Sequence, residues 1–70
     1  MSEVGETETA ILKALQELDK PSGCGDIGKQ AGINWRIVMG KLRGLKKDGL
    51  VESPIKGKYV VTERGKGLIE

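Results

Sequence analysis

The chain has 70 residues, with 12 basic and 10 acidic side chains, one cysteine and no histidine. This length predicts one small domain spanning residues 1–70. Without histidine and with a single cysteine, the sequence lacks the ligands of a zinc finger and the base of a histidine-dependent catalytic site. It also shows no nucleophile–base pair and no phosphate-binding loop, so we expect no enzyme activity, no metal and no cofactor.

The sequence shows no membrane or export signal. No apolar run approaches the roughly 18 residues that a membrane span requires, and the first residues are acidic and polar, unlike a secretory leader. A lone cysteine fits a reducing compartment. We therefore expect a cytoplasmic protein that does not bind membranes. Residues 1–5 have no periodicity and are expected to be disordered.

The net charge of +2 averages over an uneven distribution. Residues 1–19 carry one basic and five acidic side chains, a net −4; residues 20–50 carry seven and two, a net +5; residues 51–70 carry four and three, a net +1. A basic stretch on one face can meet a polyanion, and the plainer alternative is a solvated lysine-rich helix. The choice depends on the element that carries the charges.

The first predicted helix stops at Asp19-Lys20-Pro21, because a residue that precedes proline disfavours the helical region. Thr7 or a neighbour is expected to cap its start. Its apolar residues recur at the i, i+3, i+4, i+7 spacing of one helix face, at Ile11, Ala14, Leu15 and Leu18.

A second helix is predicted over Cys24–Ala31, with Ser22 or Gly23 as its N-cap and Gly32 as a left-handed residue at its end. Gly28 indicates close packing against a neighbouring helix, or else a weak point. Cys24 is expected to be a small, half-buried residue, although a cysteine at a helix start can also be reactive.

A third helix is predicted over Trp35–Lys47, with Asn34 as N-cap and Asp48-Gly49 at its end. Because residues 32–34 join it to the second helix, the pair forms a helix-turn-helix unit. One face of the third helix is apolar, at Val38, Leu42 and Leu45.

After Gly49 the pattern changes to short strands, Leu50-Val51-Glu52 and Lys58–Val61, separated by a turn at residues 53–57. Thr62 is expected to cap a last short helix that holds Leu68 and Ile69. The predicted fold is mainly α with a small β-hairpin: a three-helix core, a two-stranded hairpin and a short C-terminal helix.

This order of elements resembles the winged helix-turn-helix domains of bacterial and archaeal transcriptional regulators. Residues 32–34, the apolar face of the third helix and residues 49–52 look like the family's passage from the turn through the recognition helix into the wing. Residues 59–65 are similar to the end of the wing, where Val61 stands in place of the family's leucine. The resemblance covers about residues 7–69. It implies duplex DNA binding, with a recognition helix at about 34–47 in the major groove and a wing at about 53–58 on the backbone.

A helical wheel separates the candidate contact residues from the core. With Val38 at the centre of the apolar face, Arg36, Gly40, Arg43 and Lys47 fall about 140–200° away. Arginine suits guanine edges and phosphates, and lysine suits phosphates. The residues predicted to bind nucleic acid are Trp35, Arg36, Gly40, Arg43, Lys46, Lys47, Lys56 and Lys58.

Several of these residues also have a plainer interpretation. Trp35, about 60° from the core centre, is expected to pack against the second helix or the wing, with base stacking as the alternative. Gly40 and Gly44 either let a partner come close or weaken the helix. The resemblance implies wing-tip contacts for Lys56 and Lys58, which otherwise protect a hairpin edge.

The expected partner is duplex DNA, and RNA or a protein is the alternative. Residues 38–42 look faintly like a tRNA-binding extension of the phenylalanyl-tRNA synthetase α chain, and Trp35 with Met39 would serve a protein contact. The sequence shows no long dimerisation helix, so a monomer or weak homodimer is expected.

Overall fold

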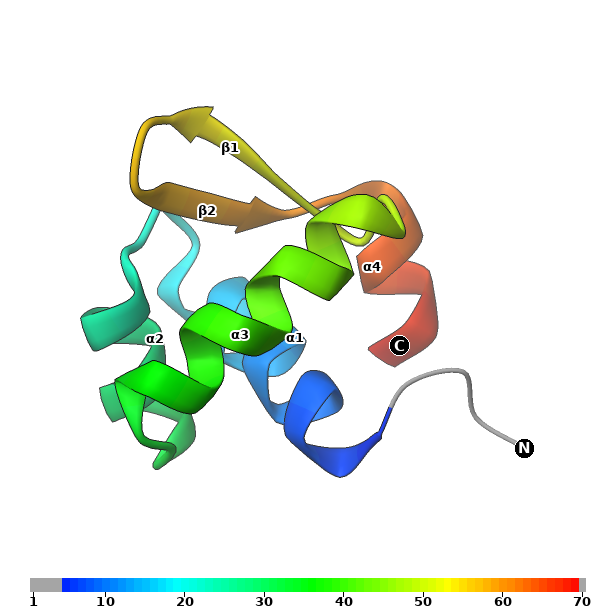
Figure 1. The fold of residues 1–70 in the computed structure, drawn as a ribbon. Coiled ribbons are helices and arrows are strands. Elements are labelled where there is room, and N and C mark those ends of the chain that lie inside the picture. Colours follow the sequence, from blue (N-terminus) through cyan, green and yellow to red (C-terminus); the bar gives the residue numbers. More distant parts are fainter. Residues whose placement is uncertain (1–4, 70) are drawn as a thin grey trace.

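The computed structural model describes residues 5–69, and in them the chain forms six elements. They are α1 (Glu6–Leu18), α2 (Cys24–Ala31), α3 (Trp35–Lys47), β1 (Val51–Ile55), β2 (Lys58–Val61) and α4 (Glu63–Ile69). Figure 1 shows the three long helices gathered beneath the β1–β2 hairpin, with α3 crossing in front of α1. The predicted fold class is confirmed. Disorder was expected for residues 1–5: residues 1–4 lie outside the described residues, and at Gly5 the expectation is wrong, because its carbonyl accepts a hydrogen bond from the N–H of Thr9 at 2.9 Å.

The two ends of α1 are closed by backbone conformation and not by a side chain. Gly5 is the N-cap and makes no side-chain capping bond, so the cap predicted at Thr7 is wrong. Asp19 ends the helix in the left-handed region, at φ 52°, and its N–H donates to the carbonyl of Leu15. The predicted stop before Pro21 is confirmed.

The core lies where α1, α2, α3 and β1 meet. Leu12 belongs to it, although it is outside the single apolar stripe predicted for α1. The buried arc is wider than one stripe because α1 contacts α2, α3, β2 and α4. The buried apolar residues are Ile11, Leu12, Ala14, Leu15, Ile27, Val38, Leu42, Leu45, Leu50 and Val51.

The turn between α2 and α3 is tight because of its glycines. Gly32 ends α2 at φ 72°, as predicted. A Cβ on Gly28 would lie 2.6 Å from the carbonyl oxygen of Ile33, and the N–H of Ile33 donates to the Gly28 carbonyl at 2.8 Å. Close packing is therefore the confirmed role of Gly28.

The start of α3 has the side-chain cap that α1 lacks. The Asn34 side chain accepts a hydrogen bond from the backbone N–H of Arg36 at 2.9 Å, which satisfies one of the free donors of the first turn. The predicted bounds of α3 are confirmed, and its buried residues are Val38, Leu42 and Leu45.

The turn of the hairpin is shorter than predicted. Residues 53–55 continue β1, which leaves Lys56 and Gly57 as the turn, with Gly57 at φ 79°. The register shifts between Glu52 and Ile55, and such an irregularity accommodates Pro54, which has no N–H for a ladder. The Ser53 hydroxyl donates toward the carbonyls of Ile55 and Lys58, each at 2.8 Å.

The hairpin is also fastened to the connection between α1 and α2. The N–H of Ser22 donates to the Tyr59 carbonyl at 3.0 Å, and the N–H of Tyr59 donates back at 2.9 Å. Ser22 is buried. A Cβ on Gly23 would lie 3.4 Å from the Gly57 carbonyl oxygen, so the hairpin turn sits beside the start of α2.

The last helix begins at the predicted cap. The Thr62 hydroxyl accepts from the N–H of Gly65 at 3.2 Å and donates to the Gly49 carbonyl at 2.7 Å. Gly65 is buried. A Cβ at this position would collide with the Leu50 carbonyl oxygen, so the site requires glycine. These contacts place the start of α4 against Gly49 and Leu50, in the connection between α3 and β1.

Candidate nucleic-acid interface

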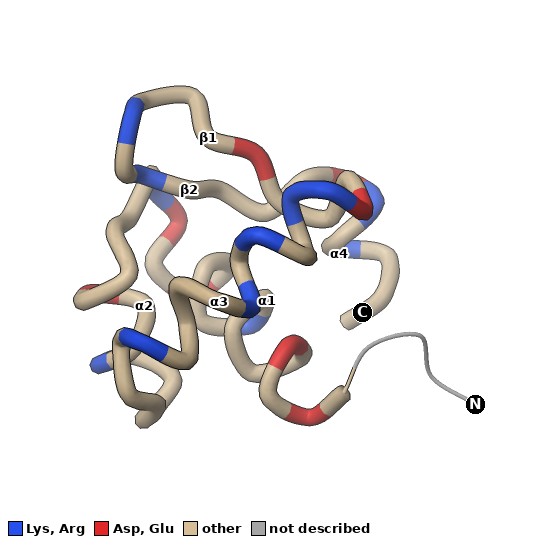
Figure 2. The backbone as a smooth tube through the Cα atoms, viewed as in Figure 1, with Lys and Arg blue, Asp and Glu red and all other residues tan. Residues whose placement is uncertain are grey.

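The outward face of α3 is exposed along its length. The exposed residues of α3 include Arg36, Gly40, Arg43, Lys46 and Lys47. Figure 2 shows Lys and Arg positions recurring along α3 and again at the hairpin turn. The structure therefore leaves all the predicted α3 residues accessible. Those 140–200° from the core centre share the outward side, whereas Lys46 lies on the flank with Met39. Their contact with nucleic acid stays a prediction.

The positive charge of this face is largely uncompensated. The sequence of α3 contains five cationic side chains and no acidic one. Lys41 pairs with Glu8 of α1, at 3.6 Å between Nζ and Oε2. Within residues 5–69, no ion pair forms at the other four cations of α3. Their charges remain available to an anionic partner.

Trp35 is half exposed, with 49% of its surface accessible, so the predicted burial is wrong. The backbone of Trp35 comes close to α2: a Cβ on Gly28 would lie 3.5 Å from its N and Cα atoms. The guanidinium carbon of Arg36 lies 5.5 Å from the ring centre, within the range of a cation–π contact. Trp35 also borders a shallow hollow of about 340 Å³, together with Lys29.

Two further apolar side chains flank the cationic face. Ile37 is 51% exposed and Met39 is 38% exposed. They lie about 100° to either side of the core centre, by the 100° step of a helix. Ile37 was not among the predicted contact residues, because contact residues outside the apolar face were selected for their charge, and an isoleucine at the boundary carries none.

The hairpin turn presents the two predicted lysines. Lys56 lies in the turn and Lys58 begins β2, and both are exposed. Ile55 beside them is 58% exposed. Because the turn sits beside the start of α2, these lysines are held by a fastened hairpin and not by a free loop. The wing predicted at residues 53–58 is thus partly strand, with its tip at Lys56 and Gly57.

Other functional candidates receive less support. Cys24 is half buried and packs against the core, as its plainer interpretation predicts. In the described part of the chain, no group of three or more Cys, Asp or Glu residues is placed to hold a metal ion. Of the described helices, none has the length and apolarity to cross a bilayer.

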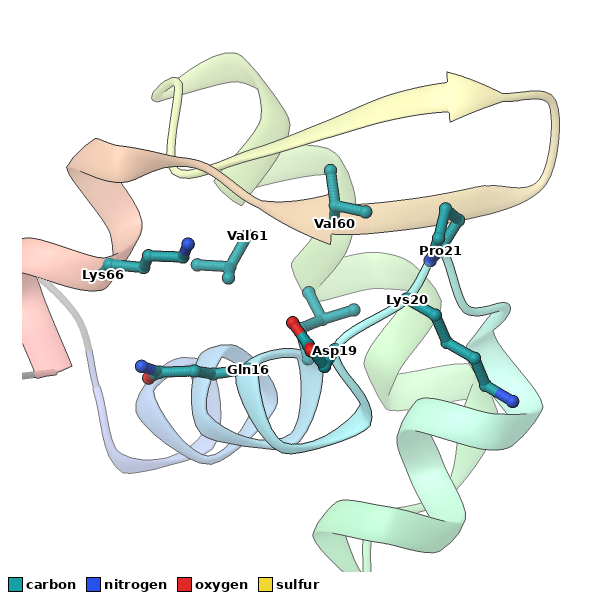
Figure 3. A pocket seen from close by; sticks show the side chains of 8 residues that line it. Gln16, Asp19, Lys20, Pro21, Val60, Val61 and Lys66 are labelled. Atoms are coloured by element: carbon teal, nitrogen blue, oxygen red, sulfur yellow. The ribbon is translucent and has the colours of Figure 1, made fainter.

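A separate shallow pocket of about 480 Å³ lies between the end of α1, β2 and α4 (Figure 3). Figure 3 shows Asp19 and Lys66 at its edges and Val61 between them. No residue that lines it comes from α3 or from the hairpin turn. Occupation of this pocket would therefore leave the cationic face free.

Comparison with protein-family models and with curated proteins gives no match. Solved structures do match in fold. ZitR of Lactococcus lactis is similar with a TM-score of 0.69 and 20% identity, over 99% of this chain and 49% of the ZitR chain, so this chain spans about half its length. Sso10a-2, a DNA-binding protein from Sulfolobus solfataricus, is similar with a TM-score of 0.68 and 26% identity, over 94% of this chain and 72% of its own. These likenesses and the element order show a winged-helix fold.

Proposed function

We propose that this winged-helix domain binds duplex DNA, with α3 in the major groove and the β1–β2 hairpin on the sugar-phosphate backbone. The observation that carries the proposal is the exposed face of α3, where four cations have no ion-pair partner among the described residues. The likeness to Sso10a-2, a DNA-binding protein, supports it. The role we propose for this binding is regulation of transcription, by analogy with the family that the sequence resembles.

The dimensions of α3 suit this placement. A helix of 13 residues is about 20 Å long and, with its side chains, about 10–12 Å wide, which matches a major groove about 12 Å wide.

The side chains divide by chemistry. Arg36 and Arg43 have planar guanidinium groups that can hold a guanine edge or a phosphate with two hydrogen bonds. Lys46 and Lys47 follow at the end of α3 and suit phosphates. The hairpin lysines, Lys56 and Lys58, would contact the backbone beside the groove.

A matched pair of double variants tests the proposal. Arg36→Gln with Arg43→Gln removes two charges from the α3 face, and Lys13→Gln with Lys20→Gln removes two charges from exposed positions elsewhere. Both pairs lower the net charge from +2 to 0. We expect the arginine variant to bind a 12-base-pair duplex at least about tenfold more weakly, and the lysine variant to change binding by less than about threefold. Fluorescence anisotropy measures both.

Salt dependence supplies a second readout. If six cations of α3 and the hairpin neutralise phosphates, the affinity falls about a thousandfold between 50 and 200 mM salt. Absence of binding to any duplex at low salt would refute the proposal, as would equal losses in the two double variants.

The exposed ring of Trp35 and the exposed Met39 favour a second candidate, a protein or RNA contact on the flank of α3. A protein contact would survive the double arginine variant and be lost in Trp35→Ala, the reverse of DNA binding. Double-stranded RNA separates the nucleic acids, because its A-form major groove is too narrow to admit α3.

A further inference from the structure

The glycines of α3 are not explained by packing. An interior glycine weakens a helix relative to alanine, and in α2 the short 2.6 Å approach of the Ile33 carbonyl accounts for Gly28. Gly40 and Gly44 differ, because a Cβ at either position would meet no atom within 4 Å. The described chain gains no contact from them. Their effect is on the outside, where the helix backbone stays uncovered.

Gly40 and Gly44 lie one helical turn apart on the exposed side of α3, and we refer to these two positions as the bare strip. Arg36 lies one turn before Gly40 and Lys47 nearly one turn after Gly44, while Arg43 lies beside them. The bare strip thus leaves the helix backbone uncovered along one side of the proposed contact face, with Arg36 and Lys47 beyond its two ends and Arg43 along one edge.

The side chains around the bare strip have little capacity to read bases. Direct readout of adenine and cytosine uses Asn, Gln, Asp or Glu, and arginine reads guanine. Residues 35–47 contain none of the first four types, and Lys and Arg are their only polar side chains. The nearest amide side chain, that of Asn34, is engaged by the backbone N–H of Arg36.

The same side chains have ample capacity for phosphate. Each exposed cation of α3 can hold a phosphate oxygen, and this contact carries no sequence information. Arg36, one of the two arginines, has its guanidinium carbon 5.5 Å from the Trp35 ring centre, so one of the two groups able to read guanine already has a partner within the chain. Phosphate contacts then outnumber base contacts.

We propose that α3 binds duplex DNA with little sequence discrimination, laying the bare strip against the groove while the framing cations hold the phosphates. This inference rests on the proposed function and adds the ligand class: B-form duplex as such, and not one operator sequence.

The test is a panel of 12-base-pair duplexes, AT-rich, GC-rich and mixed, titrated with the full 70-residue chain at one salt concentration. We expect all dissociation constants to agree within about threefold, because one good bidentate base contact would by itself separate them by about fivefold or more. A duplex that binds more than about tenfold tighter than the rest would overturn the inference.

The panel also separates the two proposals. If one duplex binds tightly and the others weakly, the proposed DNA binding is supported and only the proposed lack of sequence discrimination is contradicted. If no duplex binds, both the proposed DNA binding and the proposed lack of sequence discrimination are contradicted.

A glycine variant tests the bare strip itself. Gly40→Gln places on the strip a side chain that can pair with adenine, and Gly25→Gln places it at an equally open position of α2. Circular dichroism checks that both variants keep the wild-type helix content. We expect Gly40→Gln to widen the spread across the panel to about fivefold or more, or to weaken binding to all duplexes, and Gly25→Gln to match the wild type. Unchanged affinities for Gly40→Gln would overturn the placement of the strip against DNA.

Discussion

The helices α1 and α3 are both 13 residues long, yet they serve the molecule differently. α1 contacts α2, α3, β2 and α4, and its sequence contains no glycine. α3 buries only Val38, Leu42 and Leu45, and its other positions are exposed. α1 is therefore chiefly a core element, whereas α3 has one side for the core and one side for solvent.

The charges of the two helices show which features need a functional explanation. Acidic residues in the first turn of α1 and lysines in the last turn of α3 both follow the helix dipole. Lys46 and Lys47 are thus accounted for by helix stability alone. Arg36, at the positive end of α3, is not, and neither are Gly40 and Gly44. Residues that oppose local stability without a packing reason are the ones that mark a functional face.

The largest expected effect on stability comes from the buried side of α1, and the matched substitution lies on the exposed flank of α3. Leu12 is fully buried, so Leu12→Ala should lower the free energy of unfolding by about 2–5 kcal/mol through lost burial and a cavity. Met39→Ala, on the flank of α3, should change it by about 1 kcal/mol or less. Urea denaturation measures both, and equal losses would contradict the contrast.

Gly28 tests the inner side of α3, because it lies against the turn that leads into this helix. Gly28→Ala should destabilise the fold by about 1–3 kcal/mol, since the new Cβ would press on the Ile33 carbonyl and force the backbone to shift. Thermal unfolding followed by circular dichroism measures the loss. An unchanged melting temperature would show that the backbone of the turn shifts to accommodate the new Cβ without loss of stability, contrary to this prediction.

Gly40 tests the outer side of α3, and the sign should reverse. Gly40→Ala should stabilise the fold by about 1 kcal/mol, because alanine is the better helix former and its Cβ meets no neighbour. The same thermal melts measure the gain. Destabilisation would mean that Gly40 is not on an open helix surface, and the contrast with Gly28 would fail.

The smallest effect concerns the ion pair that joins the two helices. Lys41 and Glu8 are 3.6 Å apart, and 44% and 25% of their side-chain surfaces are exposed. Lys41→Gln should lower the free energy of unfolding by about 0.5 kcal/mol or less, because water screens exposed pairs. The difference from the wild type should vanish in 1 M salt, which urea titrations at two salt concentrations would show.

The helical part of this fold was predictable because its signals are local. Gly32, Asn34 and Thr62 act through their own conformation or through a bond to a residue two or three positions away. A window of a few residues contains everything that such a signal needs. The bounds predicted for α2, α3 and β2 are confirmed for this reason, and the exposure of the α3 cations follows from the wheel.

What the wheel and the local signals missed depends on residues far apart in the chain. Ser53 and Pro54 look like turn residues, but pairing with β2 and the register shift make them strand. Ser22 is buried because Tyr59, 37 positions later, pairs with its backbone.

The amino-acid sequence alone thus settled the order of elements, the caps at Asn34 and Thr62 and the cationic character of one helix, since each is decided within a turn or two of chain. Only the tertiary structure decided that α1 also buries Leu12, that Trp35 stays half exposed, and that the hairpin turn rests beside α2. It also separated Gly28, which a neighbouring carbonyl requires, from Gly40, which no neighbour requires. The physical reason is that burial and free space are set by which elements meet, and that depends on contacts between distant parts of the chain.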